Sequence, residues 1–279
     1  MHTLRALLFA LLAVFGWSGC FQQETTVRVK ADGSGTLEET TVMSKQAVEQ
    51  MKQMSSGLEG LLGGKGAPAG ETFKLLDEKK LRAAAEKKGE GVTFVSAKPI
   101  TTPTGEGFTA IYAFADVSKL RVDQNPGDNI PGGANAAMML GEKAKTEAVK
   151  FQFTKGAPAS LVVKLPQPKP GDLPKEKPAQ TPAGGEDAAM MMMQQMFKDM
   201  KMSLVVEVEG KIVRSNAEYQ DASRVTLMEL DFNKVLANPE KLKALTKAQP
   251  KTIEETKALV KGVDGIKAEA QPTVTIQFQ

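Results

Sequence analysis

The position of its only cysteine, Cys20, constrains this 279-residue chain more than any other feature. A lone cysteine cannot form an intramolecular disulfide, and the only histidine, His2, lies near the N-terminus. Disulfide cross-links and zinc sites built from His and Cys are therefore not available to hold a fold together. Aromatic residues make up only 5% of the chain, so we expect a core of aliphatic and methionine side chains.

Residues 1–19 are predicted to be a signal peptide. Arg5 precedes an apolar run, Ala6–Phe15, that is too short for a permanent membrane helix of about 20 residues. The segment ends with Trp17-Ser18-Gly19-Cys20, which resembles a bacterial lipobox in which Trp17 replaces the usual Leu. The resemblance implies cleavage after Gly19 and lipidation of Cys20 with two or three acyl chains, enough for stable anchoring.

The alternative is ordinary secretion after cleavage near Gly19, which leaves Cys20 as a free thiol. An exposed thiol would be a liability in an oxidising compartment, so lipidation is preferred. If the organism has two membranes, the lipoprotein resemblance places the anchor in the outer one, on its periplasmic side. This is because Phe21, rather than Asp, follows the cysteine.

Loss of residues 1–19 would also remove His2 and Trp17, and lipidation would block the thiol of Cys20. Serine–histidine triads, thiol catalysis and His/Cys zinc sites are then excluded. We therefore expect no enzymatic activity, no cofactor and no metal. Loss of Arg5 leaves 35 basic against 33 acidic residues, with no concentrated basic region, so nucleic acid is not expected as a partner.

Alternating apolar and polar residues predict strands through most of the chain. Val27, Val29 and Ala31 alternate with basic residues, and Asp32-Gly-Ser-Gly35 then predicts the turn of a hairpin. A calcium loop is the less favoured interpretation, because it needs several oxygen ligands at fixed spacing. The return strand, Thr36–Met43, ends at Ser44, a good helix N-cap.

Similar patterns predict further strands and helices. The strands are expected at about Val92–Lys98, Gly107–Ala115, Ala148–Thr154, Ala159–Leu165, Leu204–Val208, Lys211–Arg214, Arg224–Leu230 and Thr273–Phe278. Helices are expected after Ser44, at Glu78–Lys88 and Phe232–Leu236, and after the capping box Thr252–Glu255.

The expected fold class is α+β. It has one mainly antiparallel sheet of about 7–9 strands with helices on one face, interrupted by flexible Met/Gly/Pro-rich insertions. Both ends of the chain are expected in that sheet, so residues 20–279 form a single domain. The Pro/Gly/Lys-rich segment at about 166–185 is expected to be disordered. Lysine pairs such as Lys79-Lys80 and Lys87-Lys88 are expected on a solvated surface.

Methionines are concentrated between Met190 and Met202. On a helix, Met190, Met193, Met196, Phe197 and Met200 share one face, which predicts an adaptable apolar surface. Packing on the sheet, contact with lipid or a partner, and Cu(I) binding by thioethers are the three interpretations. Met51, Met54, Met138 and Met139 belong to two further Met/Ala/Gly segments. The three segments could form a movable lid over a hydrophobic groove, or they could be insertions with no selected role.

Three blocks resemble a family of uncharacterised bacterial envelope lipoproteins of the mycobacterial LppM type. They are Val27–Gly35, Gly91-Val-Thr-Phe94 with Tyr112–Asp116, and Glu209–Asn216 with Val225–Leu227. The family often has Gly and Trp where this chain has Ala217 and Leu227. The resemblance implies an α+β domain with affinity for lipid or glycolipid, and it carries over no catalytic residue.

The sequence therefore predicts a membrane-anchored, non-enzymatic lipoprotein that binds a lipid-like ligand or a protein partner in the cell envelope. A structural or assembly adaptor in an envelope complex is the first alternative, and a carboxylate-based hydrolase is the second. Two carboxylates facing each other across a cleft at roughly 5–10 Å would favour the hydrolase.

Overall fold

The computed structural model describes residues 21–61, 74–123, 147–166, 191, 194, 197–238, 240–241 and 253–279. The predicted signal peptide and nearly all of the Pro/Gly/Lys-rich segment lie outside these residues. The predictions of cleavage, of one domain and of a disordered insertion therefore stay predictions.

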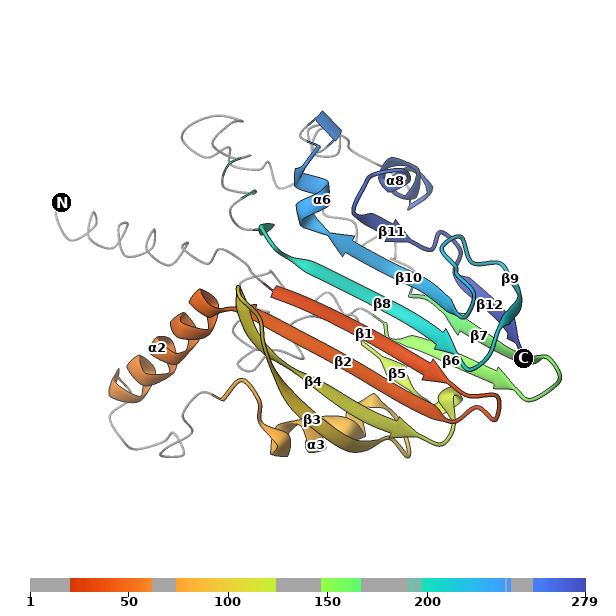
Figure 1. The fold of residues 1–279 in the computed structure, drawn as a ribbon, viewed down its shortest axis with the longest axis horizontal. Coiled ribbons are helices and arrows are strands. Elements are labelled where there is room, and N and C mark those ends of the chain that lie inside the picture. Colours follow the sequence, from red (N-terminus) through yellow and green to blue (C-terminus); the bar gives the residue numbers. More distant parts are fainter. Residues whose placement is uncertain are drawn as a thin grey trace.

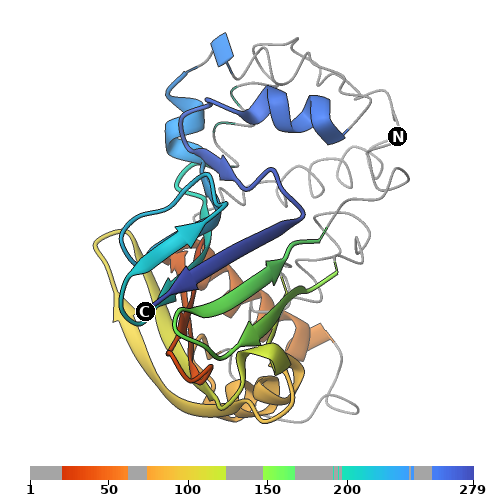
Figure 2. The ribbon, with the colours of Figure 1, turned by 90° about the vertical axis from the view of Figure 1, so that its right-hand side faces the viewer.

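The strands form two mostly antiparallel sheets, seen in two views in Figures 1 and 2. The large sheet has the order β11-β10-β8-β1-β2-β4-β3, and the small sheet has the order β5-β6-β7-β12-β9. The large sheet contains β1 (Phe21–Val29), β2 (Gly35–Ser44), β3 (Thr93–Thr101), β4 (Gly105–Phe114), β8 (Lys201–Val208), β10 (Arg224–Asp231) and β11 (Ile266–Ala268). The small sheet contains β5 (Arg121–Val122), β6 (Val149–Thr154), β7 (Ala159–Lys164), β9 (Ile212–Ser215) and β12 (Thr273–Phe278).

The helices lie around these sheets. They are α2 (Lys45–Leu61), α3 (Glu78–Ala85), α6 (Phe232–Leu236) and α8 (Ile253–Val260), with 3₁₀ turns η1 (Glu86–Lys88) and η2 (Val117–Lys119). The α+β class and the mainly antiparallel pairing are confirmed. The structure differs from the single sheet expected from the sequence, because the strands divide into two sheets. The small sheet packs on the inner face of the large one (Figure 2).

The expectation that both chain ends join one sheet is wrong. β1 belongs to the large sheet and the last strand, β12, belongs to the small one. Both edges of β1 are already occupied, by β2 on one side and by β8 on the other. The pairing of β1 with β8 is parallel and joins the first described strand to one that begins at Lys201.

One apolar core joins the two sheets. Val27, Leu37 and Val206 point inward from the large sheet, and Leu161 and Ile276 reach the same cluster from the small sheet. These side chains have no exposed surface. At roughly 25 cal/mol per Å² of apolar area, burial of such side chains is the main stabilising contribution to the fold. The inner face is the face on which the odd-numbered residues of β1 and β2 lie.

The predicted turn between β1 and β2 is confirmed as a hairpin turn. One carboxylate oxygen of Asp32 accepts hydrogen bonds from the backbone N–H and the hydroxyl of Ser34, at 2.9 and 2.7 Å. Gly33 has φ +87°, and a Cβ there would lie 2.6 Å from the ring of Phe153. Glycine therefore lets this turn pack closely on β6 of the small sheet.

Three predicted helix N-caps are confirmed. Ser44 Oγ accepts the N–H of Ala47 at 3.0 Å at the start of α2. Asp77 accepts two backbone N–H groups at the start of α3, and Asp231 accepts the N–H of Lys234 at the start of α6. Each side chain satisfies an N–H that has no partner within the helix, which is why these residues set the helix boundaries.

The edge strand β3 has features that discourage pairing with another chain. The register shifts between Phe94 and Ser96, so Val95 is an extra residue and is 54% exposed. Lys98 and Pro99 follow it, and proline cannot donate a backbone hydrogen bond. An exposed valine at this edge is thus explained by the bulge.

Candidate functional site

One end of the inner face of the large sheet is polar. Gln23 and Thr25 on β1, and Glu39 and Thr41 on β2, point inward, and each is no more than 8% exposed. Thr25 lies opposite Glu39, and Gln23 lies opposite Thr41. We call these four residues the polar half of the inner face. The apolar half lies nearer the β1–β2 turn and contains Val27, Val29, Leu37, Val206 and Val208.

The polar half contains a buried ion pair. Lys88 reaches from η1 and places Nζ 2.6 Å from both carboxylate oxygens of Glu39. Lys88 is 9% exposed and Glu39 is 7% exposed. The pair therefore holds η1 against the middle of the large sheet. The expectation that Lys87 and Lys88 are both solvated is wrong for Lys88, because its charge is neutralised by a carboxylate on the buried face of β2.

Tyr112 on β4 completes the surroundings of this pair. Its ring centroid is 4.7 Å from Lys88 Nζ, a cation–π contact, and the Phe94 ring meets it edge-on at 5.8 Å. Burial is the larger cause, and the Glu39 carboxylate the smaller, of a raised pKa for the Tyr112 phenol. The hydroxyl is buried and makes no hydrogen bond within the part of the chain that the structure describes. Tyr112 thus contributes to the structure through packing.

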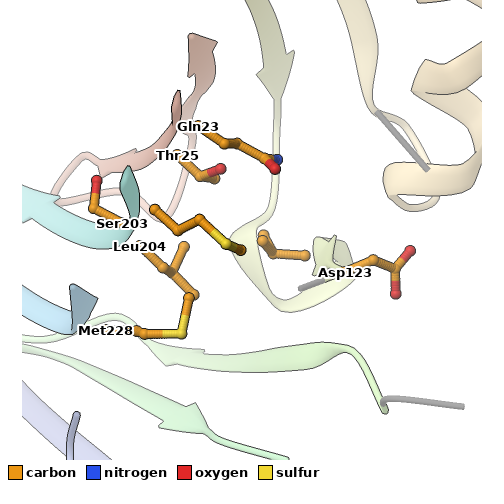
Figure 3. Close-up of a pocket in the computed structure, with 8 residues that line it drawn as sticks. Gln23, Thr25, Asp123, Ser203, Leu204 and Met228 are labelled. Carbon is orange, nitrogen blue, oxygen red and sulfur yellow. The ribbon is translucent and has the colours of Figure 1, made fainter. Parts of the chain in front are cut away.

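A small pocket opens beside the polar half (Figure 3). Gln23 and Met228 lie on facing sides of it, and Asp123, which follows β5, lies to one side. The Gln23 side-chain oxygen is buried and has no hydrogen-bond partner among the described residues. The lining residues are Gln23, Thr25, Val122, Asp123, Met202, Ser203, Leu204 and Met228.

The lining of this pocket limits what it can hold. Gln23 and Thr25 offer hydrogen-bonding groups, and Met202, Leu204 and Met228 offer apolar surface. The enclosed space has room for about one water molecule, so it accommodates a small hydrogen-bond donor and not an acyl chain. Within the described ranges, no group of three or more His, Cys, Asp or Glu side chains could hold a metal ion.

A second buried carboxylate, Glu269, has backbone partners instead of a cation. It is 7% exposed and accepts the N–H groups of Glu218 and Tyr219 at 2.8 and 3.0 Å. Burial raises the pKa of the Glu269 carboxyl, and the two hydrogen bonds act in the opposite direction. Glu269 therefore organises the turn before β10 and lies apart from the pocket.

The predicted anchor residues, Gly19 and Cys20, lie outside the described residues. Met190, Met193 and Met196 also lie outside them, as does the side chain of Met54. Met51 is described and is 6% exposed, in a small apolar cluster with Met43 and Val48. α2 thus turns Met51 toward the end of β2, and the interpretation of Met51 as part of a hydrophobic-ligand or partner surface stays a prediction.

Phe197 and Met200 belong to the helical turns that precede β8. The Phe197 ring stacks on Phe232 of α6, with centroids 4.6 Å apart, and both Phe197 and Met200 are half-buried. Asp199 and Asn233 exchange two hydrogen bonds, of 2.9 and 2.8 Å. The end of the methionine-rich segment is thereby attached to α6, while Met191 is 70% exposed.

The end of β2 and the end of the methionine-rich segment approach each other at one end of the large sheet. A small hollow there is lined by Met43 and Ser44 at the end of β2, and by Asp199 at the end of the methionine-rich segment. Gln22, at the start of β1, lines the same hollow. The predicted groove between Met51 and Met190 is not described, but the neighbouring Met43 and Asp199 are brought together.

Sequence reasoning missed Gln23, Glu39 and Lys88. Glu39 could have been identified from the sequence, because it lies two residues after Leu37 on β2 and therefore points to the same buried face. A charged residue at a buried position of a strand indicates a partner. Lys88 carried no such signal, since it lies on a short 3₁₀ turn beside an exposed lysine.

None of the described helices is long and apolar enough to cross a membrane. No protein-family model and no curated protein matches the sequence. Among solved structures, the chain is similar to the NMR structure of the folded domain of the LppM protein of Mycobacterium tuberculosis. The alignment covers 94% of this chain and 91% of that one, at 9% identity and a TM-score of 0.31. The resemblance to LppM is therefore distant.

Proposed function

We propose that this protein is an envelope lipoprotein, tethered to a membrane by a lipidated Cys20, whose domain binds and does not catalyse. The apolar run Ala6–Phe15 and the lone cysteine that follows it support export and lipidation. The observation that carries the proposal is the start of β1 at Phe21, directly after Cys20. Cleavage before Cys20 would leave every described strand intact.

The domain is proposed to bind a hydrophobic ligand or a partner beside the membrane. Exposed Met191 and half-buried Phe197 and Met200 support an adaptable apolar surface at the start of β8. β8 pairs in parallel with β1, so this surface lies at the end of the sheet that adjoins the anchor. Thioether side chains suit such a surface because they are flexible and polarisable.

An adaptor in an envelope complex is the second candidate. It is favoured by the continuous apolar core and by the small size of the pocket beside Gln23. A protein that carries a lipid inside its domain needs a cavity that can enclose an acyl chain. The pocket beside Gln23 does not offer one, so a lipid ligand is proposed to bind at the surface at the start of β8, whereas an adaptor would present the same surface to another protein.

The test is purification of the full-length protein and its Cys20→Ala variant from a bacterial host, with mass spectrometry of each. We expect the acyl mass on Cys20 and recovery in the membrane fraction, and we expect Cys20→Ala to lack both. Unmodified Cys20 would overturn the anchor.

Co-extracted lipid is measured on the Cys20→Ala protein. Bound lipid would support the surface as a lipid site, and its absence would exclude lipid as the ligand and favour the adaptor. The anchor is judged separately, from the acyl mass alone.

A further inference from the structure

The first strand leaves almost no free chain between the proposed anchor and the folded domain. Phe21 pairs with Met43 of β2, and Gln22 pairs with both Val42 of β2 and Lys201 of β8. Cys20 is joined to this two-sided pairing by one peptide unit, about 3.8 Å between Cα atoms. The domain therefore cannot move away from a lipid attached to Cys20.

We propose that the end of the large sheet that carries Phe21 rests on the bilayer, with the strands of that sheet rising away from it. We call this end of the sheet the Phe21 end. The proposed orientation depends on the proposed lipidation of Cys20. Its described residues come from the start of β1, the end of β2, the β3–β4 turn, the start of β8 and the start of α6. Figure 1 shows these strand ends on the left, opposite the β6–β7 turn.

The Phe21 end carries partly exposed apolar side chains suited to the interface of a bilayer. Phe21 packs half-buried against the cluster of Met43, Val48 and Met51. Continuing the β1–β8 register by one residue brings half-buried Met200 beside Phe21. Aromatic and thioether groups in such positions can contact headgroups and the first part of acyl chains without unfolding the domain.

The charges at this end favour anionic headgroups. Lys45, Lys198 and Lys201 are exposed, and no ion pair joins them to other described residues. The two nearby aspartates, Asp199 and Asp231, accept hydrogen bonds from Asn233 and from the start of α6. On the strands, Glu229 of β10 interacts with Lys201 but is already paired with Lys267 at 2.9 Å, and Glu106 of β4 is half-buried across from Met43.

The opposite end lacks this excess of positive charge. Its exposed lysines are matched by exposed carboxylates near the same turns. The residues are Lys30, Lys155 and Lys211 against Asp32, Asp116 and Glu209. A negatively charged membrane surface attracts unpaired lysines within about one Debye length, so the Phe21 end is the favoured contact.

The open outer face of the large sheet is less suited to the bilayer. Arg28 pairs with Glu38 at 2.7 Å and with Glu207 at 3.3 Å, and Arg224 lies 3.5 Å from Glu24. Lying flat on the membrane would bring these carboxylates against anionic headgroups. It would also bring little apolar area into contact with the membrane, because most side chains of β1 and β2 on this face are polar or charged.

Two tryptophan substitutions test the proposed orientation. The chain after Cys20 has no tryptophan, so an introduced one is the only source of indole fluorescence. Thr104→Trp places it in the exposed β3–β4 turn at the Phe21 end, and Lys155→Trp places it in the exposed β6–β7 turn at the other end. Lipidated full-length variants are reconstituted into phosphatidylcholine–phosphatidylglycerol vesicles with brominated acyl chains, which quench indole on contact.

We expect Thr104→Trp to lose most of its fluorescence and Lys155→Trp to keep its own. Equal signals, or stronger quenching of Lys155→Trp, would overturn the orientation while the protein stays in the vesicle fraction. Failure of the proposed anchor would be distinguished by a Cys20 without acyl mass and by protein outside the vesicle fraction.

A charge variant gives a second test, on unlipidated Cys20→Ala protein. Replacing Lys45, Lys198 and Lys201 with glutamine is expected to reduce cosedimentation with phosphatidylglycerol vesicles. The matched control replaces Lys30, Lys155 and Lys211 and is expected to change it little. An equal loss in both variants would overturn the contribution of charge at the Phe21 end.

Discussion

The two halves of the inner face of the large sheet follow the same alternation, yet different elements cover them. In the apolar half, Val27 and Leu37 pack into the core shared with the small sheet. In the polar half, Glu39 lies two residues further along β2 and meets Lys88 from a 3₁₀ turn. The alternation along each strand therefore determines which side chains point inward. The element that packs over them determines whether an apolar or a charged side chain is stable at that position.

The largest effect is expected from removing the cation of the polar half. Lys88→Met leaves the Glu39 carboxylate buried without a partner and should lower the free energy of unfolding by about 3–5 kcal/mol. Urea denaturation followed by circular dichroism measures it. The matched control is Lys119→Met, which breaks an exposed pair with Glu90 and should change stability by less than about 1 kcal/mol. A similar small change in both variants would contradict a special role for the buried pair.

The apolar half is expected to give a comparable loss by another mechanism. Leu37→Ala removes a side chain with no exposed surface and leaves a cavity between the sheets, which should lower stability by about 2–5 kcal/mol. The double variant Leu37→Ala/Lys88→Met tests whether the halves are independent. Residues in contact or sharing partners are expected to depart from additivity, so an additive result would separate the two halves energetically.

A smaller effect of opposite sign is expected at Tyr112, which lies between the halves. Its buried hydroxyl has no hydrogen-bond partner in the described ranges, so Tyr112→Phe should raise the free energy of unfolding by about 0.5–1 kcal/mol. Packing against Phe94 and Lys88 is retained in this variant. A loss of stability in the same urea assay would indicate that the hydroxyl donates to a group bound in the native protein.

The pH dependence of stability should show the smallest effect, at Glu269, a buried carboxylate without a cation. Burial raises the pKa of Glu269 above its unfolded value near 4.5, so the ionised form is disfavoured in the folded state. Its destabilisation is absent below the unfolded pKa and grows as pH rises through the folded pKa. The free energy of unfolding of Glu269→Gln, relative to that of the parent protein, should therefore be higher at pH 7 than at pH 4. A relative gain at pH 4 instead would reverse this assignment.

Local structure was largely predictable from the sequence. The hairpin around Asp32 and the caps at Ser44, Asp77 and Asp231 depend on neighbouring residues and were predicted at the right places. The strand Thr273–Phe278 was predicted with its bounds as observed. In these cases the interaction that sets the structure is contained within a few residues.

Long-range structure was not predictable in the same way. The parallel pairing of β1 with β8, the division into two sheets and the Lys88–Glu39 pair each join segments with no local pattern in common. Of the candidate site, parity could have indicated Glu39, but the pocket beside Gln23 requires β5 and β8 to be placed first. The methionine pattern predicted an apolar face, and only the fold distinguishes buried Met51 from exposed Met191.

The parallel pairing of β1 with β8 also determines the order in which the sheet can be completed. As the chain emerges N-terminus first, β1, β2, β3 and β4 can pair while residues 201–208 are still to come. Until then β1 is an open edge of unpaired N–H and C=O groups, held beside the membrane if Cys20 is already lipidated. Such non-local pairing is slow, and the half-formed sheet is the species most exposed to aggregation. The incomplete protein is therefore most exposed as a four-stranded sheet with an open β1 edge.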